Sequence, residues 1–278
     1  MEQYVRELQA RGSDDPDALV ALCETYWQLK RQNAAIETFK LLLRHLAPPK
    51  DRAFDEIYVA GLLATGTCPT PIGRRERLMQ LVELLCATAD VPGAVAECGC
   101  YLGLSSYLLC SFLTRSDPLF CGSGYHIFDS FQGLSEPTAD DDVPDDWENA
   151  KNLRVMTQRG RFAAPLDEVK ANLRDFPGIT FHPGWIPLTF KGLPETRYRF
   201  VHVDVDLYDP TLDAFNYFYP RLSAGGVIAS DDYSWPGARM AIDQFCMERG
   251  LALRVTACNQ AVIQNRRAAS ESSSTTCS

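Results

Sequence analysis

Five polar residues that could bind a cation or move a proton lie within two nearby stretches of the chain. His202, Asp204 and Asp206 alternate with valines, and Asp231 and Asp232 follow a second apolar run. Every second side chain of a strand points to the same face, so the first three would share a side. Such groups suit only the exposed carboxyl end of a parallel strand, where open α/β sheets bind ligands. We therefore expect a ligand site here, with solvated loop acids as the alternative interpretation.

A second stretch has the features of a cofactor turn. A short apolar strand (94–98) leads into a turn that contains Gly99 and Gly103, and a helix begins near Leu104. Glycine lets a ligand approach the backbone, and a helix start offers free N–H groups. The dinucleotide fingerprint is absent because Tyr101 stands in its middle position. Glu97, directly before the turn, favours a ligand with a cationic amino group over a pyrophosphate.

An acid also ends the next predicted strand. Asp129 closes the apolar run 124–130, and a carboxylate there commonly accepts hydrogen bonds from ribose hydroxyls. The alternative is that Asp129 caps the turn that follows it. The acid-rich and proline-rich run 134–148 is typical of a solvated loop, and a mobile lid anchored by Trp147 is a second interpretation.

The remaining pattern predicts an α/β domain with a helical extension. Helices are expected over 74–89, 161–176 and 236–248, a third strand over 179–182 and a terminal antiparallel hairpin over 251–257 and 261–264.

Before them, residues 17–48 have the spacing of a tetratricopeptide helix pair, although an ordinary helical hairpin has the same pattern. We expect a helical extension at 1–66, a catalytic domain at 67–266 and a disordered, low-complexity tail at 267–278.

The amino-acid composition limits which classes of binding partner the chain is expected to have. The formal charge of −9 over 278 residues argues against nucleic acid or an anionic membrane as the main partner. The ten cysteines are scattered and form no zinc-finger spacing, which is typical of reduced, buried thiols. The sequence contains no long uncharged apolar run, and its first residues lack the order of a signal peptide, so a cytoplasmic location is expected.

The chain resembles class I S-adenosylmethionine-dependent methyltransferases, and more closely the macrocin O-methyltransferase family, which includes mycinamicin and novobiocin sugar methyltransferases. The resemblance covers about 70–264 and is carried by AECGCYLGLSS (96–106), FDSFQGLSEP (128–137), HVDVDLYDPTLDAF (202–215), YPRLSAGGVI (219–228) and DDYSWPGARMAIDQF (231–245). It implies a Rossmann-like, seven-stranded, mostly parallel sheet with a C-terminal antiparallel hairpin.

The resemblance also implies a reaction and the residues that perform it. S-adenosylmethionine would donate a methyl group to a hydroxyl, commonly on a sugar of a natural product, with Mg²⁺ at the acceptor site. Asp206 would be the base, with His202 as the alternative. The ion would be bound by Asp204, Asp231 and Asp232. The cofactor would be held by Glu97, Gly99, Gly103, Ser105, Asp129 and Trp185.

This chemistry suits the residues, since Mg²⁺ prefers oxygen ligands and lowers the pKa of a bound hydroxyl, such as one of a vicinal diol. Residues 139–161 do not match the family, so the acceptor is not identified.

Two other functions share parts of the pattern. A nicotinamide-dependent oxidoreductase would use the same turn and ribose acid but lacks the fingerprint glycine. A non-catalytic adaptor would recruit a partner through the helix pair. A homo-oligomer formed through the N-terminal helices is a further expectation.

Overall fold

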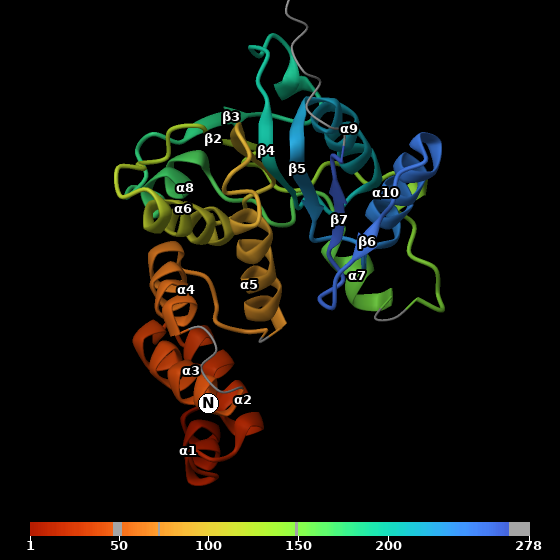
Figure 1. Ribbon diagram of the computed structural model, residues 1–278. Helices are drawn as coiled ribbons and strands as arrows, with labels where there is room; N and C mark the ends of the chain where they lie inside the picture. Colours follow the sequence, from red (N-terminus) through yellow and green to blue (C-terminus); the bar gives the residue numbers. More distant parts are fainter. Residues whose placement is uncertain (47–51, 72, 148–149, 267–278) are drawn as a thin grey trace, which may run out of the picture. The chain divides into compact units, whose positions relative to one another are not determined.

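The sheet that carries the acids is seen in a computed structural model, which describes residues 1–46, 52–71, 73–147 and 150–266 (Figure 1). The predicted tail at 267–278 lies outside the described residues. Within the described part, one seven-stranded sheet has the order β3-β2-β1-β4-β5-β7-β6. The strands are β1 Ala94–Cys98, β2 Tyr125–Asp129, β3 Thr180–Pro183, β4 Tyr198–Val203, β5 Leu222–Ser230, β6 Arg254–Val255 and β7 Ala261–Gln264. The first five are parallel, and β7 and β6 are antiparallel, which confirms the predicted fold.

The described helices are α1 Glu2–Ala10, α2 Pro16–Gln28, α3 Gln32–Leu46, α4 Arg52–Thr65, α5 Gly73–Cys86, α6 Leu104–Ser116, α7 Ala150–Met156, α8 Leu166–Asn172, α9 Tyr208–Phe218 and α10 Pro236–Arg249. Short 3₁₀ turns are η1 Ala139–Asp141, η2 Leu188–Phe190 and η3 Tyr219–Arg221. No helix among the described residues is both long and apolar enough to cross a bilayer.

The chain divides into two compact units, each described here by itself. The first unit comprises Met1–Val82, Tyr101–Cys121 and Ala164–Pro177, and the second comprises Glu83–Cys100, Gly122–Ala163 and Gly178–Ser278. All seven strands belong to the second unit.

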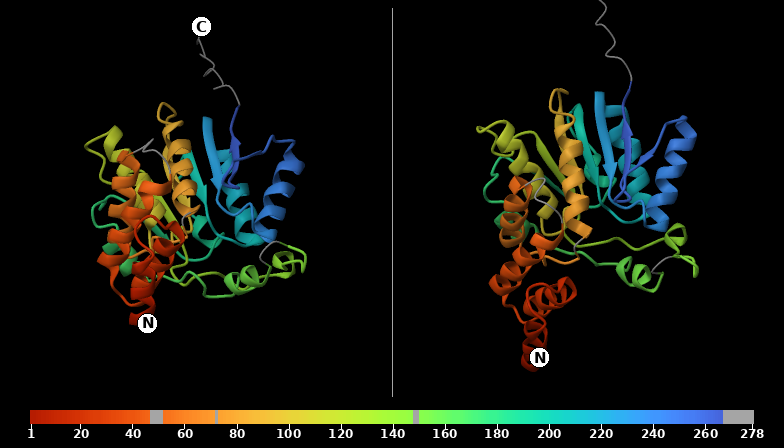
Figure 2. Two further views of the ribbon diagram at one scale, coloured as in Figure 1. Left: turned by 90° about the horizontal axis from the view of Figure 1, so that it is seen from below. Right: turned by 60° about the horizontal axis from the view of Figure 1, so that its bottom comes forward.

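In the second unit, α9 and α10 pack against each other and cover one face of the sheet (Figures 1 and 2). Val201 and Val203 of β4 point into this layer, as the alternating pattern requires, and meet Phe215 and Phe245 of the two helices. Burial of such aliphatic and aromatic side chains contributes roughly 1.5–3 kcal/mol for each. This layer fixes the position at which β4 and β5 end.

In the first unit, the predicted N-terminal helix pair is α2 and α3, which share a core with α1. A lone helix pair cannot bury its apolar face, and here Phe39 of α3 contacts Tyr58 of α4, with ring centroids 5.9 Å apart. Phe54 of α4 in turn contacts Phe112 of α6 at 6.1 Å. The pair therefore packs on the following helix, and a tetratricopeptide role stays a prediction.

Two predicted elements differ from the structure. The helix expected over 161–176 is only α8, since Phe162 has a positive φ of 59° and Pro165 cannot donate a helical hydrogen bond. The strand expected to extend through Asp206 ends at Val203. Asp206 has a φ of 60°, in the left-handed region that side-chain-bearing strand residues avoid, so the two-residue alternation stops before the acids.

A histidine pair connects β2 to β3, and from it we predict that the stability of the fold decreases in acid. His126 Nδ1 lies 3.1 Å from His182 Nε2, and the rings stack. Burial lowers the pKa of both imidazoles below 6.5, and the neighbouring His126 charge further lowers the pKa of His182. Tyr198, edge-on to His126, is uncharged because burial raises its pKa to about 12. The folded state thus binds fewer protons than the unfolded state, and stability present above about pH 6.5 is lost as the pH falls.

We expect this histidine pair to lower the free energy of unfolding, measured with urea, by ~1 kcal/mol or less between about pH 7.5 and about pH 5.5. The effect is small because both rings are half exposed and solvent screens their charges. His182→Phe retains a ring that can stack on Phe128, which the imidazole does at 4.2 Å. That variant should lose part of the pH dependence. An unchanged slope between wild type and variant would contradict the prediction.

Candidate active site

The four aspartates lie in two loops that leave the sheet side by side. Val203 and Ser230 are register partners at the ends of β4 and β5, so the residues after them emerge together. The Asp204 N–H donates to Cys98 O at 2.8 Å, and the Asp231 N–H donates to Val203 O at 3.1 Å. These bonds attach the first residue of each loop to the neighbouring strand.

Acidic and imidazole groups form two overlapping clusters after β4 and β5. One ligand atom each from Asp204, Asp206 and Asp232 lies within 4.8 Å of the others, and the same holds for His202, Asp204 and Asp231. Asp204 is common to both clusters. Three oxygen-bearing acids this close repel one another unless a proton or a cation lies between them, and hard divalent ions prefer such donors. The all-carboxylate cluster of Asp204, Asp206 and Asp232 therefore fits Mg²⁺.

Asp232 also holds the β4 loop in place. Its Oδ2 atom accepts the backbone N–H groups of Val205 and Asp206, both at 2.9 Å, although its side chain is almost wholly buried. Burial raises the pKa of Asp232 well above its usual value, and the charges of Asp206 and Asp204 raise it further. A bound cation would relieve this repulsion. The two N–H bonds explain how the left-handed backbone at Asp206 is maintained.

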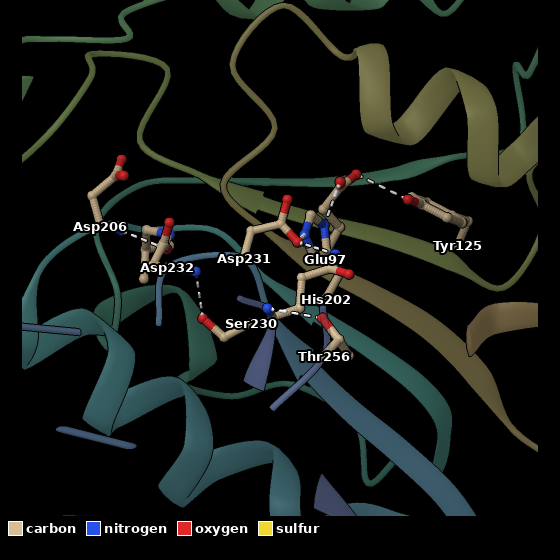
Figure 3. A network of polar contacts seen from close by, with 10 residues as sticks. Glu97, Tyr125, His202, Asp206, Ser230, Asp231, Asp232 and Thr256 are labelled. Atoms are coloured by element: carbon tan, nitrogen blue, oxygen red, sulfur yellow. Dashed lines mark hydrogen bonds and ion pairs between the residues drawn. The ribbon is translucent and has the colours of Figure 1, made fainter. Parts of the chain in front are cut away.

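His202 lies inside the sheet and does not fit the role of a base. Its side chain is 0% exposed, with Nδ1 3.0 Å from Glu97 Oε1 and Nε2 3.3 Å from Asp231 Oδ1 (Figure 3). Burial lowers the pKa of His202, but the Asp231 and Glu97 carboxylates outweigh it and raise the pKa well above 6.5. A buried imidazolium between two acids reaches no acceptor hydroxyl. The proposal of His202 as an alternative base is corrected on this ground.

Glu97 is likewise buried rather than presented to a ligand. Its side chain is 0% exposed, its Oε2 atom accepts the Tyr125 hydroxyl at 2.9 Å, and Oε1 faces His202. The expected direct contact between Glu97 and a cofactor amino group therefore does not fit this geometry. Glu97 instead compensates the buried imidazolium.

The glycine turn is shaped by the acid loop next to it. Gly99 has a φ of 79°, and an added Cβ would overlap the carbonyl oxygen of Asp204. Its N–H donates to Phe128 O at 2.9 Å. The missing side chain is thus needed for the approach of the Asp204 backbone, so the turn and the acid cluster depend on each other.

Asp129 braces the same turn from β2. Its Oδ2 atom accepts the Cys100 N–H at 2.8 Å and its Oδ1 atom accepts the Phe131 N–H at 2.6 Å. The capping alternative is therefore realised. The carboxylate is half exposed, and its oxygens have further lone pairs for ribose hydroxyls, so that role stays a proposal.

The other expected cofactor residues are distributed over both units. Trp185, half-buried after β3, belongs to the second unit with Gly99 and Asp129, and the preceding Gly184 N–H donates to Asp129 O at 2.9 Å. Gly103, with a φ of 91°, precedes α6, and Ser105 is buried in its first turn. These two belong to the first unit, and their cofactor role remains a prediction.

The acid-rich run contains a buried residue that the sequence interpretation missed. Asp141 is 6% exposed, accepts the Thr138 N–H at 2.9 Å and accepts the Tyr208 N–H, the first of α9, at 2.6 Å. A Cβ on Gly237 of α10 would overlap it. Thr138 and Asp141 form a capping box, which is the signal that could have revealed the turn.

The segment also contacts the start of α10 through Trp147. The Trp147 indole N–H donates to Ser234 O at 3.2 Å, and the Arg239 guanidinium lies 5.7 Å from its ring. Figure 2 shows this part of the chain, coloured green, extending to α10. The run is thus not simply a solvated loop, and Trp147 is held by polar contacts, while the interpretation as a mobile lid stays a prediction. Gln260, which donates to Asp231 Oδ1 at 2.6 Å, was missed as well.

Comparison with known proteins identifies the family. Residues 50–267 match the family described as Macrocin-O-methyltransferase (TylF). The chain is 31% identical over 183 residues to the 8-demethyl-8-(2,3-dimethoxy-alpha-L-rhamnosyl)-tetracenomycin-C 4'-O-methyltransferase of Streptomyces olivaceus, which covers 64% of this chain and 67% of that relative. It is 30% identical over 183 residues to the mycinamicin III 3''-O-methyltransferase of Micromonospora griseorubida, covering 64% of this chain and 70% of the relative.

A solved structure agrees with these sequence matches. The O-methyltransferase NovP is 26% identical, superimposes with a TM-score of 0.55, and covers 70% of this chain and 81% of its own. The matched family region includes the glycine turn and both acid loops. The chain therefore belongs to the macrocin-O-methyltransferase family, and the relatives that it matches are named O-methyltransferases.

Proposed function

We propose that the chain transfers the methyl group of S-adenosylmethionine to a hydroxyl on a sugar of a natural product, with Mg²⁺ bound by Asp204, Asp231 and Asp232. The observation that supports the metal assignment is that Asp204, after β4, shares one cluster with Asp232 and the other with Asp231, two residues that follow β5; the three proposed ligands do not together make up either cluster. Family membership supports the methyl donor. The nicotinamide and adaptor alternatives gain no support from the structure or the relatives.

The relatives support a sugar hydroxyl as the acceptor. The tetracenomycin enzyme is named for methylation at the 4' position of a compound that carries a rhamnosyl group, and the mycinamicin enzyme for methylation at a 3'' position. Sugars offer vicinal hydroxyls, which can place two oxygens on one hard cation. A small-molecule glycoside is therefore the acceptor class that we propose, in a cytoplasmic enzyme.

The roles of the residues follow from their positions. When bound, Mg²⁺ would lower the pKa of an acceptor hydroxyl. Asp206 is the proposed base that takes the hydroxyl proton on its carboxylate, and Asp232 keeps the Asp206 backbone in place through two N–H bonds. Asp129 is proposed to accept from the ribose, and Gly99 leaves the backbone of the turn accessible. Methyl transfer then requires mainly that oxygen, carbon and sulfur be aligned.

The proposal predicts that cofactor binding and the metal requirement of methyl transfer can be measured separately. The pure chain should bind S-adenosylhomocysteine saturably in calorimetry, because cofactor and cation would occupy different residues. Methyl transfer to mycinamicin III or another glycoside from a panel, followed by mass spectrometry, should stop with EDTA and return with Mg²⁺. Turnover that survives EDTA would overturn the metal role, and absence of saturable binding would overturn the cofactor role.

A further inference from the structure

A row of five buried polar side chains crosses the sheet from β2 to the turn before β7, and Figure 3 labels four of them, Tyr125, Glu97, His202 and Asp231. The Tyr125 hydroxyl donates to Glu97 at 2.9 Å, and Glu97 faces His202 Nδ1 at 3.0 Å. His202 Nε2 lies 3.3 Å from Asp231 Oδ1, to which the Gln260 amide donates at 2.6 Å. The side chains are at most 2% exposed. Asp231, next to the end of the row, is the one member that belongs to the proposed ligands of the cation.

Strand register and a tight turn bring these residues together. Glu97 and His202 are register partners on β1 and β4, so their side chains lie next to each other. Gln260 is fixed by the turn between β6 and β7, where its N–H donates to Thr256 Oγ1 at 3.0 Å and its carbonyl accepts the Thr256 N–H at 2.9 Å. The terminal hairpin therefore delivers the Gln260 amide to Asp231.

One hydrogen bond and one ion pair meet at the same oxygen of Asp231. Gln260 Nε2 and His202 Nε2 both approach Oδ1. Rotation of the carboxylate about its Cβ–Cγ bond would break both the hydrogen bond from Gln260 and the ion pair with His202. Asp231 is thus held in one orientation by residues that do not themselves need to touch the cation or the acceptor.

We propose that His202 and Gln260 are positioning residues that fix the Asp231 carboxylate for the divalent cation, an inference that rests on the proposed function. Groups that orient a metal ligand typically change metal affinity 10–100-fold when they are removed. Gln260 carries the clearer test because its side-chain amide contacts Asp231, whereas His202 also supports Glu97.

The test is Gln260→Met, which keeps the length of the side chain and removes the donor. Titration calorimetry of the full-length, metal-free chain with Mn²⁺ should show an affinity about 10-fold weaker than that of the wild type. Binding of S-adenosylhomocysteine in EDTA should change less than about twofold, since the Gln260 side-chain amide donates to Asp231, which is not a proposed cofactor residue. Gln264→Met, an exposed position on β7, is the matched control and should leave Mn²⁺ binding unchanged.

His202→Gln is the second variant. A glutamine amide can donate to only one of the two carboxylates, so Mn²⁺ binding should weaken at least as much as in Gln260→Met. Gln260→Asn, which keeps the amide on a shorter side chain, gives a milder test in the same direction if Gln260→Met does not fold.

The outcomes separate three cases. A folded Gln260→Met protein with lower thermal stability but wild-type Mn²⁺ affinity would overturn the inference, because it would show a purely structural role. Wild-type chain that binds no Mn²⁺ would overturn the proposed cation site itself, and this inference with it. Weaker Mn²⁺ binding in Gln260→Met, with both the cofactor product and Gln264→Met unaffected, is the result that supports it.

Discussion

Replacing Asp204 with asparagine should abolish detectable Mn²⁺ binding and lower methyl transfer on the order of 1,000-fold or more. Asp204 is the carboxylate shared by both acid clusters, so its loss leaves neither cluster with three acidic or imidazole groups. Asparagine keeps the size of the side chain and its carbonyl oxygen but removes the charge. Calorimetry with Mn²⁺ and single-turnover methyl transfer would measure the two losses.

Asp206→Asn is the matched variant, because it makes the same chemical change in the same loop. As the proposed base, Asp206 should be needed for proton removal, which is worth about 100- to 10,000-fold in rate, and much less for cation affinity. The folded variant should therefore bind Mn²⁺ within a few-fold of the wild type while turnover falls. Loss of Mn²⁺ binding equal to that of Asp204→Asn would make Asp206 a ligand and end its assignment as base.

S-adenosylhomocysteine binding in EDTA distinguishes these effects from general damage. Neither aspartate is proposed to hold the cofactor, so both variants should retain an affinity within about threefold of the wild type. If Asp204→Asn retains both Mn²⁺ binding and turnover, the metal assignment is wrong. If cofactor binding is lost in both variants, the substitutions disturb the loop rather than the chemistry.

The general location of the acids could be predicted from the sequence. The valine-rich run before Asp204 and the apolar run before Asp231 both form parallel strands, and the carboxyl ends of adjacent parallel strands meet at one edge. The terminal antiparallel hairpin was also predictable, since 261–264 is a short apolar run directly after a turn. Local pattern and global fold agree at these positions.

The roles of individual acids and histidine were less predictable, for a physical reason. The alternation of side chains along a strand would place His202, Asp204 and Asp206 on one face only if the strand included all three. However, β4 ends at Val203. Beyond that point the backbone conformation is set by Asp232. Its carboxylate accepts hydrogen bonds from two backbone N–H groups that are distant from it in sequence. His202 therefore belongs to the sheet interior, and the two acids after it belong to the loop.

Burial decided the role of Glu97 in the same way. The local sequence of an acid before a glycine turn is the same whether the acid faces a ligand or a buried imidazolium. The partners of Glu97, Tyr125 and His202, come from β2 and β4, and no spacing along the chain reveals that contact. Asp141 differs, because its capping box with Thr138 is local and could have been recognised within the acid-rich run.

The turn at Gly99 connects the two halves of the site, and substituting it should have the second large effect. Gly99→Ala would place a Cβ against the carbonyl oxygen of Asp204, a backbone atom that cannot move as a flexible side chain can. The left-handed φ of 79° adds strain of roughly 1–2 kcal/mol. We expect the free energy of unfolding to fall by at least about 3 kcal/mol, measured by urea denaturation.

Gly124→Ala is the control that separates the effect of the Cβ clash at Gly99 from the effect of backbone strain. Gly124 has a φ of 77°, almost the same as that of Gly99, but an added Cβ there meets nothing within 4 Å. It should therefore lose only the roughly 1–2 kcal/mol of backbone strain. Where Gly99→Ala remains folded, displacement of Asp204 should also weaken Mn²⁺ binding, whereas Gly124→Ala should leave it unchanged. Equal losses of stability in the two variants, with equal Mn²⁺ affinity, would show that the turn and the acid loop are independent, because the contact between Gly99 and Asp204 would then carry no energy.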